Sequence, residues 1–290
     1  NGVRPGNRLM GSMLSKYCNG IIINYPRHKY RLQPPNDIIW REIEQIKNSY
    51  IVLIKHFITT TGKIRFDPKV IRELKRNNNK IIYIVVDAIA KNEKLFRQEI
   101  NKYANLYDLV LFGSNYQRDV FKDIVPSKVL YHLWDELLQP NKSKDFNMCY
   151  IGSTLPWKNY MLKCLDIDIM EVTKHGEMKY EKIRDYNCHY SVREKNNQSW
   201  KYGVTSKIAT AAATHSNILC SKDRCFIEVL PEYDYYISKI EEIPDMMEKM
   251  KKEFNTPPWY KNIERIKQLK ERLSPTTIGK DFKNFINFLS

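Results

Sequence analysis

Short apolar runs with the length of β-strands alternate along the chain with amphipathic stretches with the length of helices. The clearest apolar run is at residues 80–87, where Ile, Tyr and Val follow one another before an Asp. In the first half, this pattern predicts strands at residues 20–25, 50–56, 80–87, 106–112 and 128–131, and helices at residues 38–47, 68–76, 93–103 and 113–121.

A polar stretch at residues 139–145 interrupts the pattern and has the composition of a linker. The second series predicts strands at residues 147–151, 167–172, 188–193 and 218–220, and helices at residues 157–165, 177–186, 206–214, 240–253 and 260–272. The last segment, residues 280–289, has its apolar residues on one helical face, so we expect it to dock on a domain.

Strand–helix–strand order of this kind produces mostly parallel sheets with helices on both faces. The sequence therefore predicts an α/β protein with two doubly wound, Rossmann-like domains that face each other across a cleft. We place these domains at residues 1–138 and 146–277, and we expect the helix at residues 278–290 to pack on the first one. The sequence begins with Asn1 rather than Met, so we expect a trimmed or processed end at which the first domain can lack a strand.

The composition is typical of a soluble globular protein, with 42% hydrophobic and 28% charged residues. The sequence has no uncharged apolar run of about 18 residues, which a membrane-spanning helix requires, and no visible signal peptide. Its six cysteines form no CxxC pair. We therefore expect reduced thiols and a cytoplasmic location.

The net charge of +15 is distributed unevenly. Residues 1–145 contain 25 Lys and Arg against 14 Asp and Glu, whereas the remainder contains 23 against 19. An anionic partner is therefore expected to meet the first half. A general bias toward basic residues in this chain is the alternative explanation.

The segment with the most candidate chemistry begins at Arg193, at the end of a predicted strand, and continues into a predicted helix with Thr205, Ser206 and Lys207 at its start. Thr205 or Ser206 suits the N-cap position. A helix N-terminus attracts anions, and Lys207 and the forked guanidinium of Arg193 add positive charge to it. This combination favours a site for a diphosphate.

The chain here resembles the C-terminal half of GT-B glycosyltransferases. The resemblance rests on the order of Gly152-Ser153-Thr154, Lys158, the Lys207-Ile208-x-x-Ala-x-Ala helix, a strand and the segment at residues 226–230. It extends over residues 80–250, because residues 107–115 and 128–135 are similar to the end of the family's N-terminal domain. It implies that the backbone at Gly152 and Ser153 approaches a nucleotide-sugar donor and that the lysines meet its phosphates.

The resemblance departs from the family at its acidic residues. Retaining family 4 enzymes carry two glutamates eight positions apart, where this chain has Tyr202 and Thr210, and His215 replaces the usual glycine. The stereochemistry and the donor sugar therefore stay open. Thr210 is kept as a candidate donor contact. Glu228 is a candidate for the ribose hydroxyls, because a carboxylate can accept hydrogen bonds from both, and a solvated acid at a helix start is the alternative.

The first half must supply the residues that act on the acceptor. His56 and Asp87 end predicted strands at the ligand-binding edge of the sheet, and Asp87 resembles the acid or histidine that follows this strand in GT-B enzymes. An inverting enzyme would use one of them as general base, whereas a retaining enzyme would not need it. Asn7 and Arg8 belong to a glycine-containing segment that is similar to the family's loop facing the cleft, so we expect them to contact the acceptor.

Other signatures are missing from the sequence. There is no GxxxxGK[ST], GxGxxG or HExxH motif, which argues against a P-loop NTPase, a dehydrogenase and a zinc protease. The Asp-x-Asp at residues 166–168 matches a metal-binding motif of a different glycosyltransferase fold and lies outside that context. We therefore expect no bound metal and no cofactor.

The sequence thus predicts a hexosyl- or pentosyltransferase that moves a sugar from a UDP- or GDP-linked donor to a hydroxyl acceptor. Its basic first half is compatible with a modified DNA, a polysaccharide, or a lipid-linked glycan met at an anionic membrane surface. Two alternatives stay open. A non-catalytic nucleic-acid-binding protein would explain the aromatic and basic residues at 25–31, and a degenerate GT-B protein would explain the missing glutamates.

Overall fold

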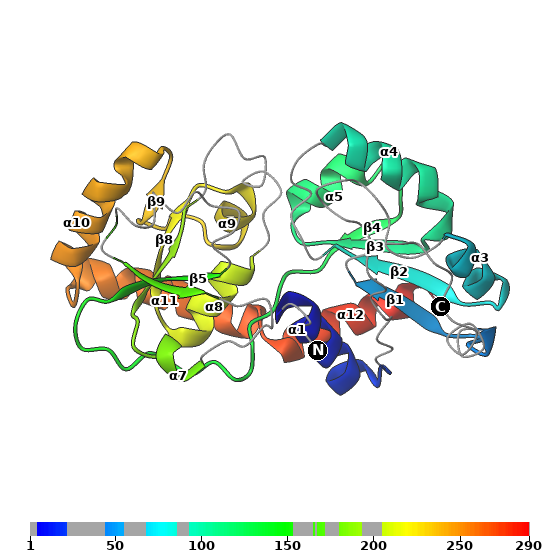
Figure 1. The fold of residues 1–290 in the computed structure, drawn as a ribbon, viewed down its shortest axis with the longest axis horizontal. Coiled ribbons are helices and arrows are strands. Elements are labelled where there is room, and N and C mark those ends of the chain that lie inside the picture. Colours follow the sequence, from blue (N-terminus) through cyan, green and yellow to red (C-terminus); the bar gives the residue numbers. More distant parts are fainter. Residues whose placement is uncertain are drawn as a thin grey trace.

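The computed structural model of the chain describes residues 5–21, 44–54, 68–85, 93–152, 165, 167–171, 180–192 and 205–289. These residues form two parallel β-sheets that are covered by helices (Figure 1). The α/β class predicted from the alternating pattern is confirmed. The strand predicted at residues 20–25 and the helices predicted at 38–47 and 157–165 lie mostly outside the described residues, which include only 20–21, 44–47 and 165 of these ranges.

The first sheet contains four parallel strands in the order in which they occur along the chain. These are β1 (Tyr50–Ile54), β2 (Lys80–Ile84), β3 (Leu109–Phe112) and β4 (Ser127–Val129). β3 is shorter than predicted, because residues 104–106 form a 3-10 turn before it. The Asp108 carboxylate then accepts a hydrogen bond from the backbone N–H of Ile81, at 2.7 Å.

Helices cover both faces of the first sheet, which explains the unbroken apolar sequence of β2. Ile81 and Tyr83 pack with the face that holds α3 (Pro68–Arg76), α4 (Glu93–Tyr103) and α5 (Asn115–Phe121). Ile82 and Ile84 pack with α1 (Pro5–Cys18) and α12 (Pro275–Leu289) on the other face. Figure 1 shows α1 and α12 side by side beneath this sheet. The first sheet thus shares its core with the last helix described.

Four of the described helices begin at a proline: α3 begins at Pro68 as predicted, and the other three starts differ from the prediction. α1 begins at Pro5, α11 (Pro257–Arg272) at Pro257 and α12 at Pro275. Proline fits the first helical position because the N–H that it lacks would have no partner there. Asn7 and Arg8 therefore lie in the first turn of α1, and the loop predicted for them is wrong.

The second sheet contains five parallel strands in the order β6-β5-β7-β8-β9. Their bounds are β5 Met148–Gly152, β6 Asp168–Glu171, β7 Cys188–Ser191, β8 Asn217–Ser221 and β9 Tyr236–Ile237. The chain steps from β5 outward to β6 and then returns past β5 to β7. The direction of winding therefore reverses between β5 and β7, which is where doubly wound sheets bind ligands, beyond the carboxyl ends of the strands.

The helices of the second sheet are α7 (Tyr180–Ile183), α8 (Ser206–Thr214), α9 (Arg224–Val229), α10 (Ile243–Glu253) and α11. α8 matches its predicted bounds and lies against β7, β8 and α11. Its alanines at 209, 211, 212 and 213 are fully buried, because small side chains allow close contact between helix and sheet.

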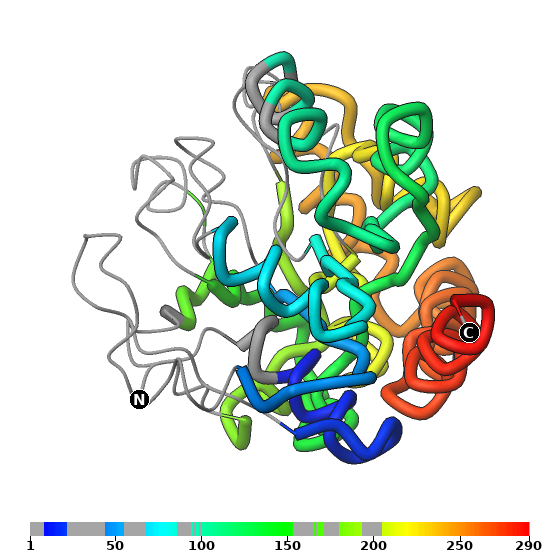
Figure 2. Tube along the Cα trace, turned by 90° about the vertical axis from the view of Figure 1, so that its right-hand side faces the viewer, coloured from blue at the N-terminus to red at the C-terminus, as the bar shows by residue number. Residues whose placement is uncertain are grey.

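We call the first sheet with α1, α3, α4, α5 and α12 the first body, and the second sheet with α7 to α11 the second body. The chain crosses between them twice, through residues 130–147 and between α11 and α12. Trp134 joins the two crossings, because its backbone N–H donates to the Leu273 carbonyl at 3.2 Å and its indole N–H to the Lys270 carbonyl at 2.7 Å. In Figure 2, α11 and α12 (orange to red) lie together on one side of the molecule. The predicted domain limits stay predictions.

Candidate functional site

The two central strands of the second sheet are paired over only part of their length within the described residues. β5 pairs with β7 at Met148–Cys188 and at Cys149–His189, and β5 then continues to Gly152 while β7 continues to Ser191. The pairing therefore ends before the carboxyl ends of both strands, at the point where the winding reverses. We call this end of β5 and β7 the fork.

Gly152 at the tip of β5 has a backbone that favours glycine, with φ at +156°. A β-carbon at this position would stand 2.9 Å from the Tyr150 hydroxyl and 3.0 Å from Lys207 Nζ. These distances are shorter than normal van der Waals contacts, so a side chain here would displace the lysine or the tyrosine. Glycine thus leaves the half-buried backbone at the fork without a side chain beside a cation.

Lys207 brings its ammonium from the first turn of α8 to the tip of β5. Its Nζ lies 4.9 Å from the centre of the Tyr150 ring, a distance at which the ring attracts a cation. Because an α-helix carries partial positive charge at its N-terminus, α8 and Lys207 place positive charge at the same end of the sheet. The sequence prediction that Lys207 belongs to an anion site is therefore compatible with its position.

His189 lies at the last position at which β7 pairs with β5, and its side chain is buried. Its Nε2 atom is inaccessible to solvent and has no hydrogen-bond partner among the described residues. Burial, and secondarily the charge of Lys207, lower the pKa of this imidazole to about 3. His189 is therefore neutral at physiological pH. Its sequence context did not mark it as a site residue, because one histidine in an apolar strand gives no functional signal.

The hydroxyls predicted at the α8 N-terminus have different partners. Thr205 is fully buried, and its Oγ1 accepts a hydrogen bond from the backbone N–H of His132 at 3.1 Å. It occupies the N-cap position, but its side chain makes no capping bond, so it ties α8 to the linker instead. Thr210 donates its hydroxyl to the Ser206 carbonyl at 3.0 Å, one turn earlier in the same helix.

His215 ends α8 in the left-handed conformation, with φ at +54°. This is the position where the resemblance expects glycine, which adopts such a backbone without a steric penalty. Here the His215 N–H donates to the last turn of the helix, and its imidazole Nε2 lies 3.1 Å from Lys270 Nζ. The helix end is thus built without glycine.

Glu228, predicted to contact a ribose, is directed to the first body. Both its carboxylate oxygens lie within hydrogen-bonding distance of the Asn115 backbone N–H, at 3.1 and 3.0 Å. The Asn115 side-chain amide donates to Oε1 at 2.7 Å, and the Tyr131 hydroxyl donates to the same oxygen. In this arrangement the carboxylate is engaged by α5 and the linker.

The structure describes only some of the predicted site residues. His56, Asp87, Ser153, Lys158 and Arg193 lie outside the described residues. For Asn7 and Arg8 the structure describes only the helical backbone. The residues it places at the fork are Gly152 and Lys207, with Ser206 adjoining in the first turn of α8.

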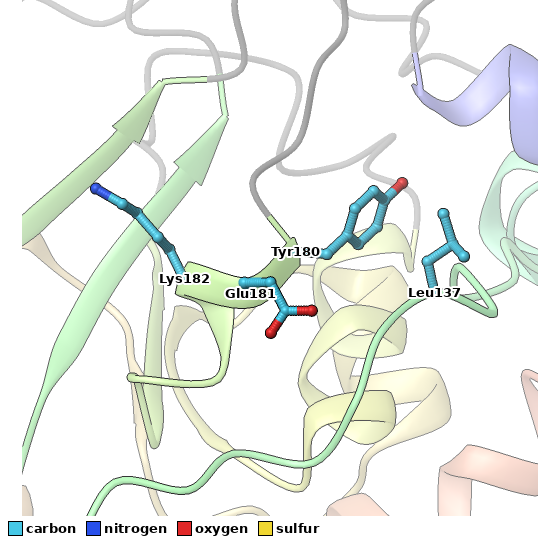
Figure 3. A pocket seen from close by; sticks show the side chains of 4 residues that line it. All are labelled: Leu137, Tyr180, Glu181 and Lys182. Carbon is cyan, nitrogen blue, oxygen red and sulfur yellow. The ribbon is translucent and has the colours of Figure 1, made fainter.

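A surface cavity of about 560 Å³ lies beside the linker, lined by Leu137, Tyr180, Glu181 and Lys182 (Figure 3). The Tyr180 hydroxyl donates to the buried Asp135 carboxylate, which ties the start of α7 to the linker. None of the predicted site residues lines this cavity, so we locate the candidate site at the fork.

The described residues contain neither a metal-binding group of side chains nor a membrane-spanning helix. No group of three or more His, Cys, Asp or Glu side chains is arranged to hold a metal ion. No helix in this part of the chain has the length and apolar character needed to cross a membrane.

No protein-family model and no curated protein matches the sequence. Solved structures do match the fold. Anabaena HepE in complex with UDP-glucose aligns with a TM-score of 0.57 and 11% identity, over 76% of this chain and 77% of HepE. The pneumococcal O-GlcNAc transferase GtfA, with UDP and GlcNAc, aligns with a TM-score of 0.57 and 11% identity, over 87% of this chain and 59% of GtfA.

Sucrose-phosphate synthase from Thermosynechococcus elongatus aligns with a TM-score of 0.54 and 8% identity, over 77% of this chain and 71% of the synthase. These proteins are GT-B glycosyltransferases with Rossmann-like domains. At such low identity the likeness concerns the arrangement of strands and helices, which agrees with the two parallel sheets described above. This chain therefore has the GT-B fold.

Proposed function

We propose that the chain is a glycosyltransferase that uses a nucleoside-diphosphate sugar, with UDP- and GDP-linked sugars as the first candidates. The observation that carries this proposal is the position of Lys207 Nζ at the fork, 3.0 Å from the point where a β-carbon on Gly152 would stand. An ammonium beside a glycine backbone at a topological switch point is suited to a diphosphate. Solved proteins of the same fold contain UDP or UDP-glucose.

In the proposed reaction, the acceptor oxygen forms a bond to the anomeric carbon while the bond from that carbon to the diphosphate oxygen breaks. The diphosphate leaves with the electron pair. Lys207 and the N-terminus of α8 stabilise the negative charge that develops on it. Arg193, Lys158 and Ser153 are proposed, from the sequence alone, to contact the same donor. No metal is assigned to this step.

The acceptor hydroxyl loses its proton in this reaction. In an inverting mechanism the proposed base is Asp87 or His56, both chosen from their positions after predicted strands. In a retaining mechanism the departing diphosphate oxygen would accept the proton, and neither residue would be needed. Thr210 and Glu228 fit the donor site less well than the sequence suggests, because their side chains have other partners in this arrangement.

The acceptor is proposed to be anionic or to lie next to anionic groups, because the chain carries a net charge of +15. DNA, a polysaccharide and a lipid-linked glycan all meet this description. Titration with duplex DNA at low and at physiological salt separates them. A DNA acceptor predicts affinity that falls steeply with salt, whereas a glycan acceptor predicts little DNA binding at physiological salt.

The donor site is tested by thermal-shift measurements with UDP, GDP, ADP and their sugars. Wild-type protein should melt at a higher temperature with one nucleotide class. Lys207→Ala should weaken that nucleotide's affinity by about tenfold to a hundredfold, since a hydrogen bond to a charged group contributes roughly 1.5–3 kcal/mol. Lys251→Ala is the matched control, because Lys251 is exposed on α10 of the same body.

A shift that persists unchanged in Lys207→Ala would remove Lys207 from the donor site. A well-folded protein that responds to no nucleotide would contradict the proposed function. The non-catalytic nucleic-acid-binding hypothesis would then be preferred if DNA binds, and the degenerate GT-B hypothesis if it does not.

A further inference from the structure

The two bodies meet through α5 and α9 as well as through the chain crossings. Glu228 on α9 accepts hydrogen bonds from the backbone N–H and the side-chain amide of Asn115 at the start of α5. It also accepts one from Tyr131, which follows β4 in the linker. One half-buried carboxylate of the second body therefore accepts hydrogen bonds from three donors, two on Asn115 of the first body and one on Tyr131 of the first crossing.

A second contact supports the same alignment of α5 and α9. The Arg224 guanidinium lies 4.2 Å from the centre of the Tyr116 ring, within the range of a cation–π interaction. Arg224 and Glu228 are four residues apart on α9, so they lie on the same face of that helix. Tyr116 follows Asn115 at the start of α5. Two adjacent residues of α5 are thus contacted by one face of α9.

The α5–α9 contact lies away from the α11–α12 crossing. Figure 1 shows α5 and α9 near the top of the space between the bodies, and the passage from α11 to α12 near the bottom. The crossings are held together by the hydrogen bonds of Trp134. The contacts of α5 with α9 therefore lie in one region and the covalent crossings in another, as in a hinge with a latch, and Tyr131 connects Glu228 to the start of the first crossing, three residues before Trp134.

We propose that Glu228, with Asn115 and Tyr131, is a latch that holds the two bodies in the relative orientation seen here. The bodies can change their relative orientation when this carboxylate is released, with the crossings at Trp134 as the hinge. Glu228 is then a positioning residue, which acts by setting where the first body lies relative to the fork.

The Tyr131 hydroxyl acts as a hydrogen-bond donor in the latch at neutral pH. Burial, together with the neighbouring Glu228, raises the pKa of the Tyr131 phenol to about 12, although Arg272 opposes this shift. The hydroxyl therefore stays protonated and donates. Because both Glu228 oxygens are engaged, any contact of this carboxylate with a donor's ribose requires the latch to open first.

Small-angle X-ray scattering and the distance between two fluorophores test the latch in the full chain. One fluorophore is placed on exposed Arg72 of α3 and the other on exposed Lys251 of α10, after each has been replaced by a residue that carries the label. Glu228→Ala should increase the radius of gyration and broaden the distance distribution. Glu248→Ala, which removes an exposed carboxylate from α10, should change neither.

The partners provide the second test. Asn115→Ala or Tyr131→Phe alone should produce a smaller change than Glu228→Ala, and adding either to Glu228→Ala should produce no further change, since the bond is already lost. These milder variants also cover the case in which Glu228→Ala fails to fold. Identical scattering and distances in wild type and in all folded latch variants would overturn the proposal.

Nucleotide thermal shifts in the same variants separate this inference from the proposed function. An altered distance with a retained nucleotide shift supports the latch and leaves the donor site intact. A lost nucleotide shift with an unaltered distance overturns the latch and assigns Glu228 to the donor. If wild type shows no nucleotide shift, the proposed function fails, but the distance measurement still tests the latch.

Discussion

The protonation of His189 should make the second body sensitive to acid in a predictable way. Its imidazole is buried at the last position at which β7 pairs with β5. Its Nε2 has no hydrogen-bond partner among the described residues, and the charge of Lys207 lies nearby. Burial and Lys207 lower the pKa of this residue to about 3 in the folded chain, against about 6.5 in an unfolded chain. Below pH 6.5 the unfolded state therefore binds a proton that the folded state does not.

The sign and the size follow from this difference in pKa. The stability associated with neutral His189 is fully present above about pH 6.5 and is lost as the pH falls toward about 3. At about pH 4.5 the two pKa values correspond to a loss of roughly 2 to 3 kcal/mol of unfolding free energy relative to neutral pH. Carboxylates elsewhere also titrate in this range, so the test compares wild type with variants that differ only at this position.

Urea unfolding followed by tryptophan fluorescence, at about pH 7.5 and about pH 4.5, measures this loss. His189→Phe and His189→Asn both remove the titration, and they differ in size and polarity, so a packing defect would affect them differently. Each variant should lose about 2 to 3 kcal/mol less than wild type between the two pH values, whatever its stability at neutral pH. Equal pH dependence in wild type and both variants would refute the reasoning.

Three further predictions concern other packed positions. Gly152→Ala should weaken nucleotide binding about tenfold or more in the thermal-shift assay, because the new β-carbon meets Lys207 Nζ and the Tyr150 hydroxyl; unchanged binding would separate the fork from the donor site. Gly279→Ala should lower the unfolding free energy, measured in urea, by about 1–3 kcal/mol, because the new β-carbon would stand 2.8 Å from the Tyr17 β-carbon. Lys280→Ala, on the exposed side of α12, is the control and should leave the unfolding free energy unchanged. Among the described cysteines, half-buried Cys18 should be alkylated first, and the four buried ones should react only on unfolding, as followed by mass spectrometry; rapid labelling of a buried thiol in the folded protein would contradict the burial.

The elements that could be predicted from the sequence are those with a local cause. β2 was recognisable because a strand buried on both faces has an unbroken apolar run, and α8 because small residues follow a hydroxyl pair and a lysine. The starts of α11 and α12 also carried a local signal, in Pro257 and Pro275, that the periodicity alone did not use.

The remaining features depend on contacts between distant residues. Nothing near Thr205 in the sequence indicates that its hydroxyl bonds to the backbone at His132, and nothing near Glu228 points to Asn115. Each partner lies more than 70 residues away. His189 was invisible for a related reason, since its effect depends on burial and on Lys207 from another element. The pattern therefore indicated the two parallel sheets and helix α8, but not the partners of the polar groups around them.

The place of α12 in the first body has a consequence for the order of events during translation. The second body is built from one continuous stretch between β5 and α11, so all its strands and covering helices have been synthesised before α12. The first sheet begins to emerge earlier, yet the face formed by Ile82, Ile84 and Leu109 is completed by Ile278 and Phe282, which are made after the whole second body. Domains usually fold from the N-terminus as the ribosome proceeds. Here the half made first is completed only after the half made second, because the part of its apolar face that α12 covers, beside α1, stays open until α12 leaves the ribosome.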